Sequence, residues 1–210
     1  MRSYSKMILL AALSTVTMAH AQLVRSMGVK VGAVAANQRW SYAFGDLNTD
    51  TRWGFTGSAF MELLDIPVVS IILEAQYTQK GMSFRTPVTT AANPDATGDF
   101  ITRRPRVDYL SIPLLAKARW ETPVLDVYAM AGPRYDLLLT RHGDGVDIVI
   151  DQFRSAEAGA TIGLGIETRQ LLSVGLLAEV RYNLSFGDAF SADLLTVRNH
   201  TIDLMAGVRL

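Results

Sequence analysis

The sequence predicts an all-β protein, an eight-stranded antiparallel up-and-down barrel that crosses a membrane. Three observations support this fold class. Eight segments alternate between apolar and polar residues, and the connections between them alternate between short and long. The apolar face also carries too much bulk for the inside of so small a barrel.

Eight segments place apolar side chains at every second position, as a strand with one apolar face does. In the seventh segment Leu176, Val180 and Leu184 lie on one face. Glu179 and Arg181 lie on the other face. The expected strands span residues 27–38, 51–62, 67–80, 107–120, 124–139, 154–168, 172–186 and 197–209.

The connections between the strands follow a second alternation. Three of them are the short links LLDIP, ETP and RQL, and the others are long and polar, including residues 81–106. An up-and-down strand order places all short links and both termini at one end and all long links at the other. Bacterial outer-membrane barrels have this plan, with periplasmic turns and extracellular loops.

The volume of the lumen decides which face points inward. The interior of an eight-stranded barrel is just wide enough for its own side chains, so the bulky aliphatic face must point outward, and only lipid can cover such a surface. The charged face then fills the lumen, where its members must pair with one another or with water. The expected lumenal charges are Lys30, Arg52, Glu62, Glu74, Lys117, Arg119, Asp126, Arg134, Glu157, Glu167, Arg169, Glu179, Arg181 and Asp203.

Aromatic residues near the strand ends agree with a membrane location. Interfacial girdles of outer-membrane barrels are rich in such side chains. The candidates are Trp53, Phe55, Tyr77, Trp120, Tyr182 and Phe186. The alternative fold is a soluble lipocalin-like barrel or a β-sandwich with the apolar face inside, and that fold would require a signal for a ligand cavity.

The first 21 residues have the features of a secretory signal peptide. Arg2 and Lys6 precede an apolar run that ends in Ala19-His20-Ala21, so cleavage is expected before Gln22. The alternative, a membrane-anchoring helix, needs a longer apolar run. We therefore divide the chain into a signal peptide, 1–21, and an outer-membrane barrel domain, 22–210.

Composition excludes several other classes of protein. Without the leader the chain has 18 basic and 20 acidic side chains, a net charge of −2, which argues against a nucleic-acid partner. The chain has no cysteine, so it has neither disulfides nor thiolate sites. Asp65 and Glu74 interrupt its most apolar stretch after the leader, which rules out a spanning helix there.

Two prolines, Pro113 and Pro133, lie inside expected strands, where each removes a backbone donor, so we expect β-bulges or local register changes there. Pro113 belongs to the segment YLSIPLLAK, residues 109–117. This segment resembles the PorT-like outer-membrane β-barrel family, whose members carry a similar segment in a central strand. The matching residues are Tyr109, Leu110, Ile112, Pro113, Leu114, Leu115 and Lys117.

The PorT-like resemblance implies an integral barrel that the barrel-assembly machinery inserts into the outer membrane. It also implies that Pro113 is tolerated and that the protein could be an accessory of protein secretion. The last residue, Leu210, departs from the terminal aromatic residue of many such barrels.

Residues that could carry chemistry lie mainly in the long connections. His142 and His200, with Ser155 and Ser191, could form a lipid-modifying site, but their spacing assigns no Ser-His-acid arrangement. Three acidic residues could ligate a hard cation, although they lack the spacing of a calcium loop, and three arginines could bind lipopolysaccharide phosphates. The acidic residues are Asp144, Asp147 and Asp151, and the arginines are Arg103, Arg104 and Arg106.

The sequence therefore predicts a monomeric, non-enzymatic outer-membrane barrel with no cofactor and no metal. Its expected role is structural or interactive, through the extracellular loops, with outer-membrane lipids, lipopolysaccharide or a protein as partner. A narrow porin-like channel is the alternative. A surface lipid-modifying enzyme is the third hypothesis.

Overall fold

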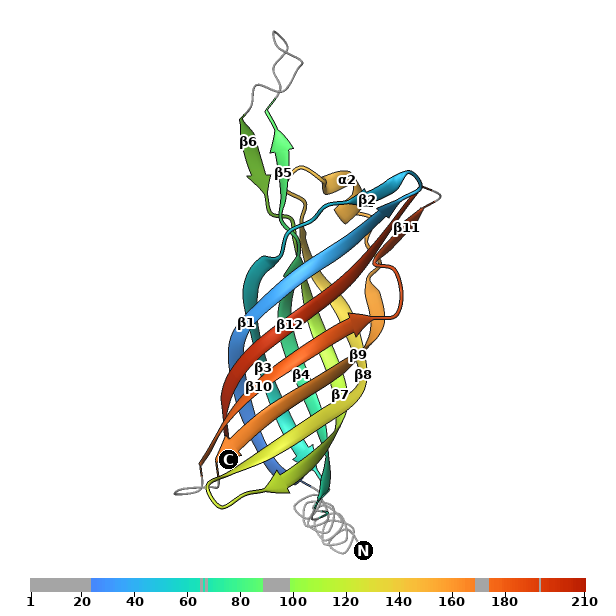
Figure 1. The fold of residues 1–210 in the computed structure, drawn as a ribbon. Helices are drawn as coiled ribbons and strands as arrows, with labels where there is room; N and C mark the ends of the chain where they lie inside the picture. Colours follow the sequence, from blue (N-terminus) through green and yellow to red (C-terminus); the bar gives the residue numbers. More distant parts are fainter. Residues whose placement is uncertain (1–23, 65, 67, 89–98, 169–173, 193) are drawn as a thin grey trace, which may run out of the picture.

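Eight long strands close into one barrel (Figure 1). The computed structural model describes residues 24–64, 66, 68–88, 99–168, 174–192 and 194–210. The expected signal peptide lies outside the described residues. The barrel strands are β1 (Val24–Tyr42), β3 (Arg52–Leu63), β4 (Val69–Gly81), β7 (Arg106–Glu121), β8 (Leu125–His142), β9 (Ala156–Thr168), β10 (Gly175–Ser185) and β12 (Leu195–Arg209).

Each barrel strand pairs antiparallel with the barrel strand that follows it, and β12 returns to pair with β1. Met27 and Leu210 exchange backbone hydrogen bonds of 3.2 and 2.7 Å where the first and last strands meet. Closure removes the sheet edge, as hydrocarbon requires of any β-structure. The all-β, eight-stranded antiparallel up-and-down barrel predicted from the sequence is therefore confirmed.

The two ends of the barrel differ as predicted. The expected short link RQL, residues 169–171, lies outside the described residues. β3 ends and β4 begins at the end of the barrel where β1 begins and β12 ends, and residues 122–124 join β7 to β8 at that same end (Figure 1). We call this the short-turn end and the opposite end the long-loop end. No helix within the described ranges has both the length and the apolar character to cross a membrane.

The long connections contain structure that the alternation did not predict. β2 pairs with β1 and β11 pairs with β12, so the wall continues beyond the barrel on one side. β5 and β6 form a separate two-stranded arm that rises above the long-loop end (Figure 1). These elements are β2 (Gly45–Leu47), β5 (Phe84–Pro87), β6 (Phe100–Arg103), β11 (Phe190–Ala192) and the one-turn helix α2 (Asp147–Ile150).

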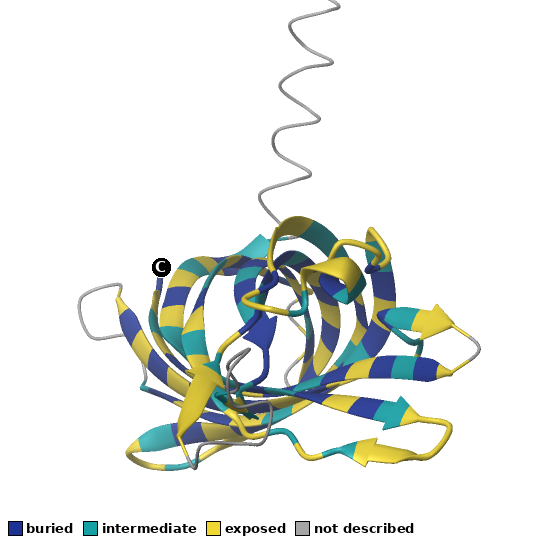
Figure 2. Ribbon diagram, turned by 90° about the horizontal axis from the view of Figure 1, so that it is seen from above, coloured by how far each residue is buried: buried dark blue, intermediate teal, exposed yellow. Residues whose placement is uncertain are grey.

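The apolar face of the strands points outward. Leu164 and Leu176 are both 59% exposed, whereas Glu179 is 6% and Arg181 1% exposed. Seen along the barrel axis, buried and exposed residues alternate along the strands around the ring (Figure 2). Because no other part of the protein covers these leucines, we conclude that lipid surrounds them.

The expected bulges or register changes at the prolines do not occur. The register of β4 on β7 is the same on both sides of Pro113, and that of β7 on β8 is the same on both sides of Pro133. Only a few residue pairs next to each proline are missing from the ladder. The register of β7 on β8 shifts instead between Asp108 and Tyr109, toward the long-loop end. Each proline thus leaves a gap in one ladder while the inward and outward alternation continues.

Two apolar clusters lie inside the barrel, which the prediction of a charged lumen did not include. The inner apolar cluster consists of Phe60, Ile72, Leu115, Tyr128, Met130 and Leu177. The mouth cluster lies toward the long-loop end and consists of Trp40, Met82, Val107, Tyr109, Ile150, Phe153, Ala189, Leu195 and Val197. The lumen therefore contains buried apolar side chains as well as charged ones.

Candidate functional site

The middle of the lumen holds a balanced group of two cations and two anions, the central ion cluster: Lys30, Glu74, Glu179 and Arg181. Lys30 Nζ lies 2.8 Å from Glu74 and 3.1 Å from Glu179. Arg181 donates two hydrogen bonds to Glu74, at 3.0 and 2.8 Å. Its Nε also donates a hydrogen bond to Glu179, at 2.8 Å. Each charge therefore has two partners of opposite sign, as burial of ions requires.

A second group lies toward the short-turn end, the turn-end ion cluster: Glu62, Lys117, Arg119, Glu167 and Arg209. Lys117 Nζ lies 2.7 Å from Glu167 and 3.3 Å from Glu62. Arg209, which was not among the expected lumenal charges, donates to Glu167 at 2.9 Å. Arg209 lies on the same face of the alternating pattern as Asp203, so that pattern could have identified it.

A third group lies toward the long-loop end, the loop-end ion cluster: Lys80, Arg134, Asp136 and Glu157. Asp136 accepts from Lys80 at 2.5 Å and lies 3.0 Å from Arg134. Glu157 accepts from the Tyr109 hydroxyl at 2.6 Å, which connects this cluster to the mouth cluster. Lys80 and Asp136 fall on the inward face but were not among the expected charges.

The structure places the remaining expected charges as follows. Asp203 is fully buried and accepts hydrogen bonds from Gln76 and Asn183, both at 2.8 Å. Asp126 is buried near the short-turn end. Arg52 is only half-buried, at the start of β3, so it lies at the rim instead of in the lumen. Arg169 lies outside the described residues.

One lysine of each ion cluster also stacks on an aromatic ring. Lys30 Nζ lies 4.4 Å from the ring centre of Phe60, Lys117 Nζ lies 4.2 Å from that of Tyr128, and Lys80 Nζ lies 4.4 Å from that of Tyr109. Such contacts contribute about 2 kcal/mol or more when they are desolvated. Since Phe60 and Tyr128 belong to the inner apolar cluster and Tyr109 to the mouth cluster, each ring connects an ion cluster to an apolar cluster.

The long loops fold back over the mouth of the barrel. Ile150 of α2 and Phe153 are 0% and 2% exposed and belong to the mouth cluster. Arg141 donates to the Phe153 carbonyl at 2.8 Å, which fixes the loop that carries both residues. The sequence alone did not reveal this closure, because the apolar positions in this loop follow neither strand nor helix periodicity over a useful length.

The residues considered for catalysis are not brought together. His142 is exposed and its ring lies 3.4 Å from Arg106, while His200 lies on the outer face of β12 opposite Leu184. Within the described part of the chain, no hydrogen bond joins either histidine to Ser155 or Ser191.

The acidic residues of the loop before β9 have separate roles. Asp144 accepts from the backbone amide of Arg104 at 2.6 Å, and Asp147 accepts from that of Gly145 at 3.2 Å. Over the ranges that the structure describes, no three histidine or acidic side chains gather as a metal site would require. Asp151 follows α2 and is exposed.

Two of the three loop arginines, Arg103 and Arg106, have side chains next to an acidic neighbour. Arg103 lies 3.4 Å from Asp144 and Arg106 lies 3.2 Å from Asp108. Arg104 lines a small cleft together with Arg52. Elsewhere at this end, the Ser41 hydroxyl and then the Arg39 guanidinium lower the pKa of Asp46, which therefore stays ionised next to Arg39.

The aromatic residues expected in girdles mostly face outward. Trp53, Phe55 and Phe186 are 63%, 49% and 64% exposed near the long-loop end, and Trp120 is 55% exposed near the short-turn end. Tyr77 stacks against Phe55 with ring centres 6.3 Å apart. These positions suit the two membrane interfaces.

The chain is similar to solved structures of outer-membrane proteins. Outer membrane protein OprG from Pseudomonas aeruginosa is 10% identical, with a TM-score of 0.52 over 90% of this chain and 97% of that chain. Neisserial surface protein A is 17% identical, with a TM-score of 0.46 over 87% and 96%. At this identity the likeness to OprG shows the fold alone. A search of curated proteins finds no match.

The family comparison covers most of the chain. The family model described as "Outer membrane protein beta-barrel domain" matches residues 16–191. The match agrees with the closed eight-stranded wall and its apolar outer face, and it indicates the outer membrane of a Gram-negative bacterium. The chain therefore belongs to the family of outer membrane protein beta-barrel domains.

Proposed function

We propose that this barrel acts through its long-loop end as a docking surface for another protein, and that it is neither an enzyme nor an open pore. The observation that carries the proposal is the contrast between the mouth and the surface above it. The mouth cluster fills the entrance, whereas large apolar side chains on the loops remain exposed. These exposed side chains are Phe44, Phe100, Ile101, Ile148 and Leu194.

The exposed loop residues are unusual for a surface in water. Phe44 is 96% exposed, and the preceding residue, Ala43, donates its amide to the Leu194 carbonyl, which brings the two loops together. Phe100 is 61% exposed on the β5–β6 arm, which rises above the barrel (Figure 1). Exposed apolar groups surrounded by polar residues are typical of protein-binding surfaces.

The segment that resembles the PorT-like family supports an accessory role in protein secretion as the specific form of this function. Its side chains are largely explained by barrel packing, since Tyr109 and Lys117 point into the lumen and Ile112 and Leu114 face outward. The secretion role therefore depends on the resemblance, and a secretion assay in cells must test it.

The other parts of the proposal concern assembly and surroundings. We infer insertion by the barrel-assembly machinery, a monomeric state, and contact with outer-membrane lipids and lipopolysaccharide. The charged lumen favours one alternative function, a narrow porin-like channel, because its polar side chains could carry water or ions if the mouth opened.

A photo-crosslinking experiment in intact cells tests the docking surface. A benzophenone amino acid replaces Phe100 on the arm or, as the control, Leu164 on the lipid-facing wall. We expect a discrete protein adduct from position 100 and only lipid adducts from position 164. Replacing Ile101 and Phe44 by serine should weaken the adduct from position 100. Absence of any protein adduct at position 100 would contradict the proposal.

A further inference from the structure

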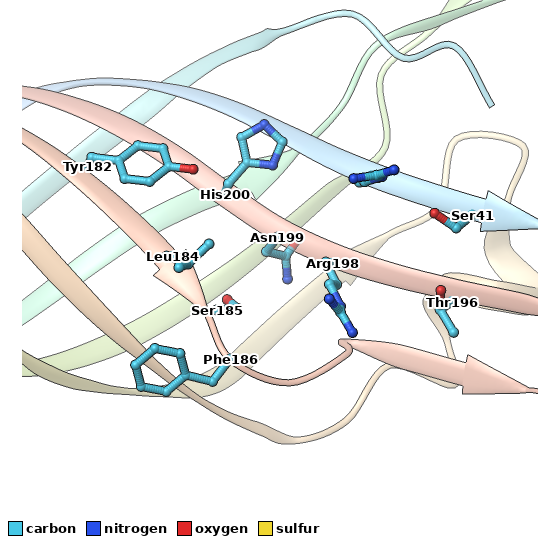
Figure 3. Close-up of a pocket in the computed structure, with 10 residues that line it drawn as sticks. Ser41, Tyr182, Leu184, Ser185, Phe186, Thr196, Arg198, Asn199 and His200 are labelled. Carbon is cyan, nitrogen blue, oxygen red and sulfur yellow. The ribbon is translucent and has the colours of Figure 1, made fainter. Parts of the chain in front are cut away.

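The wall of the barrel opens where β10 leaves β12. The last residue pair between these strands is Leu184 with His200, and β12 next pairs with β11 at Val197. On this side Arg198 and Asn199 have no partner in the described strands. A groove of about 770 Å³ lies at this break, between β10, β12 and the end of β1 (Figure 3).

The floor of the groove is sealed toward the lumen. Ser185 and Asn199 are 5% and 2% exposed, and both donate to the Glu157 carboxylate, at 2.9 and 2.8 Å. These hydrogen bonds engage the two polar side chains at the bottom of the break. A ligand in the groove would therefore lie on the outer wall and would not pass into the lumen.

Two arginines stand directly opposite each other at the edge of the groove. Arg39 of β1 and Arg198 of β12 are register partners, and their side chains are 70% and 62% exposed. Like charges in directly opposite positions destabilise a strand pair. Asp46 and Asp188 lie 3.0 and 2.6 Å from the two guanidinium groups and offset part of this repulsion.

The two guanidinium groups keep donors available for a ligand. A guanidinium carries five N–H donors in a planar fork that matches a phosphate group. Asp188 accepts from Nε of Arg198, and Asp46 accepts from Nε and Nη2 of Arg39. The remaining amino groups could bind one phosphate from two sides, with His200 lining the groove nearby.

The opposite side of the groove is apolar. Tyr182, Leu184 and Phe186 line it and are 41%, 44% and 64% exposed (Figure 3). Along the outer face of β12, the apolar residues end at Ile202, and the polar residues His200 and Arg198 follow. The groove thus crosses the level at which hydrocarbon gives way to lipid headgroups.

We propose that this groove binds a phosphate-bearing lipid of the outer leaflet. The phosphate lies between Arg39 and Arg198, and an acyl chain lies along Leu184 and Phe186. The guanidinium donors that the two aspartates leave free, together with the boundary position, favour this ligand over a protein segment. This site specifies the lipid contact inferred under the proposed function, and it is separate from the loop docking surface, so the lipid site and the docking surface can fail independently.

The test measures lipid binding to the purified full-length barrel in a neutral detergent by native mass spectrometry. The probes are dioctanoyl phosphatidic acid and dioctanoylglycerol, which share their acyl chains and differ in the phosphate. We expect the wild type to bind phosphatidic acid more than about tenfold tighter than dioctanoylglycerol, since charge-assisted hydrogen bonds are the strong ones. Equal affinity for the two lipids would overturn the proposal.

Two double variants with the same change in charge locate the site. Arg39→Gln with Arg198→Gln should lose about tenfold or more in affinity for phosphatidic acid. Arg85→Gln with Arg154→Gln, at two exposed arginines that do not line the groove, should leave the affinity unchanged. Arg39→Lys with Arg198→Lys, which keeps the charge but loses the planar fork, should bind more tightly than the glutamine variant and less tightly than the wild type. If the first variant binds as the wild type does, the site is not this groove.

A third variant and a competitor separate a lipid site from an ion site. Leu184→Ser with Phe186→Ser should weaken phosphatidic acid binding several-fold, although it keeps both arginines. Inorganic phosphate should compete poorly, because it lacks the acyl chains. If this variant binds normally and phosphate displaces the lipid, the groove binds an ion only and the lipid proposal is wrong.

Discussion

Arg181 and Glu74 form a two-pronged ion pair across the lumen, with guanidinium-to-carboxylate distances of 3.0 and 2.8 Å. Their strands, β10 and β4, are not neighbours in the wall, so the pair joins opposite sides of the barrel. Such a pair stabilises only while it remains complete, because loss of one partner leaves a buried ion without compensation.

Glu74→Gln should therefore destabilise the barrel by about 3–5 kcal/mol, since Lys30 and Arg181 would then share one carboxylate. Adding Lys30→Met restores the balance of charge and should recover part of the loss. Urea unfolding in vesicles measures both effects. Asp151→Asn, at an exposed acidic residue, is the control and should change little. Equal stability of wild type and Glu74→Gln would contradict the role of the cluster.

Two leucines of nearly equal exposure should respond differently to the same substitution. Leu164 on the wall is 59% exposed and Leu194 in a long loop is 61% exposed. Leu164→Arg should cost about 2–4 kcal/mol, because it places a charge in hydrocarbon. Leu194→Arg should change the unfolding free energy by less than about 0.5 kcal/mol. Similar small costs would mean that both side chains face water.

The mouth cluster should prevent conduction. In planar bilayers the wild type should show no stable current, whereas Ile150→Asp should open the mouth, because it places a charge among fully buried apolar side chains. Ile148→Asp is the matched control, since Ile148 lies on the same helix and is 81% exposed. A steady wild-type current that Ile150→Asp does not alter would favour the channel alternative.

A glycine in β9 provides room for the ring that supports the central ion cluster. A Cβ atom on Gly165 would lie 2.3 Å from the Tyr128 ring, and the Tyr128 hydroxyl donates to Glu179 at 2.7 Å. Gly165→Val should displace the ring and cost about 1–3 kcal/mol in thermal or urea unfolding. Gly187→Val, where a Cβ meets nothing within 4 Å, should be neutral. An equally neutral Gly165→Val would show that the ring moves freely.

Much of the wall could be predicted from the sequence, because alternation is a strong signal when one face meets lipid and the other meets ions. The expected span 107–120, for example, differs from β7 (Arg106–Glu121) by one residue at each end. The expected bulges at Pro113 and Pro133 were wrong, because an unpaired backbone position can be absorbed as a gap without an extra residue.

The structures above the wall were missed for a different reason. β2, β5, β6 and β11 are three or four residues long, too short for periodicity to be recognised. The inward turn of Phe153 and Ile150 depends on contacts with Trp40 and Val197, which are distant in the sequence. The wall groove likewise depends on where β10 stops pairing, which no local pattern specifies.

Site-directed spin labelling tests the central claim most directly, because the chain has no cysteine and single cysteines can be introduced freely. Labels at Leu164 and Leu176 are compared with labels at Thr161 and Ser185, whose side chains point inward. In vesicles, the first two labels should collide with oxygen dissolved in lipid far more than with a water-soluble nickel complex. Labels at Leu164 and Leu176 that relax mainly with the nickel complex would show an aqueous outer face and contradict the account.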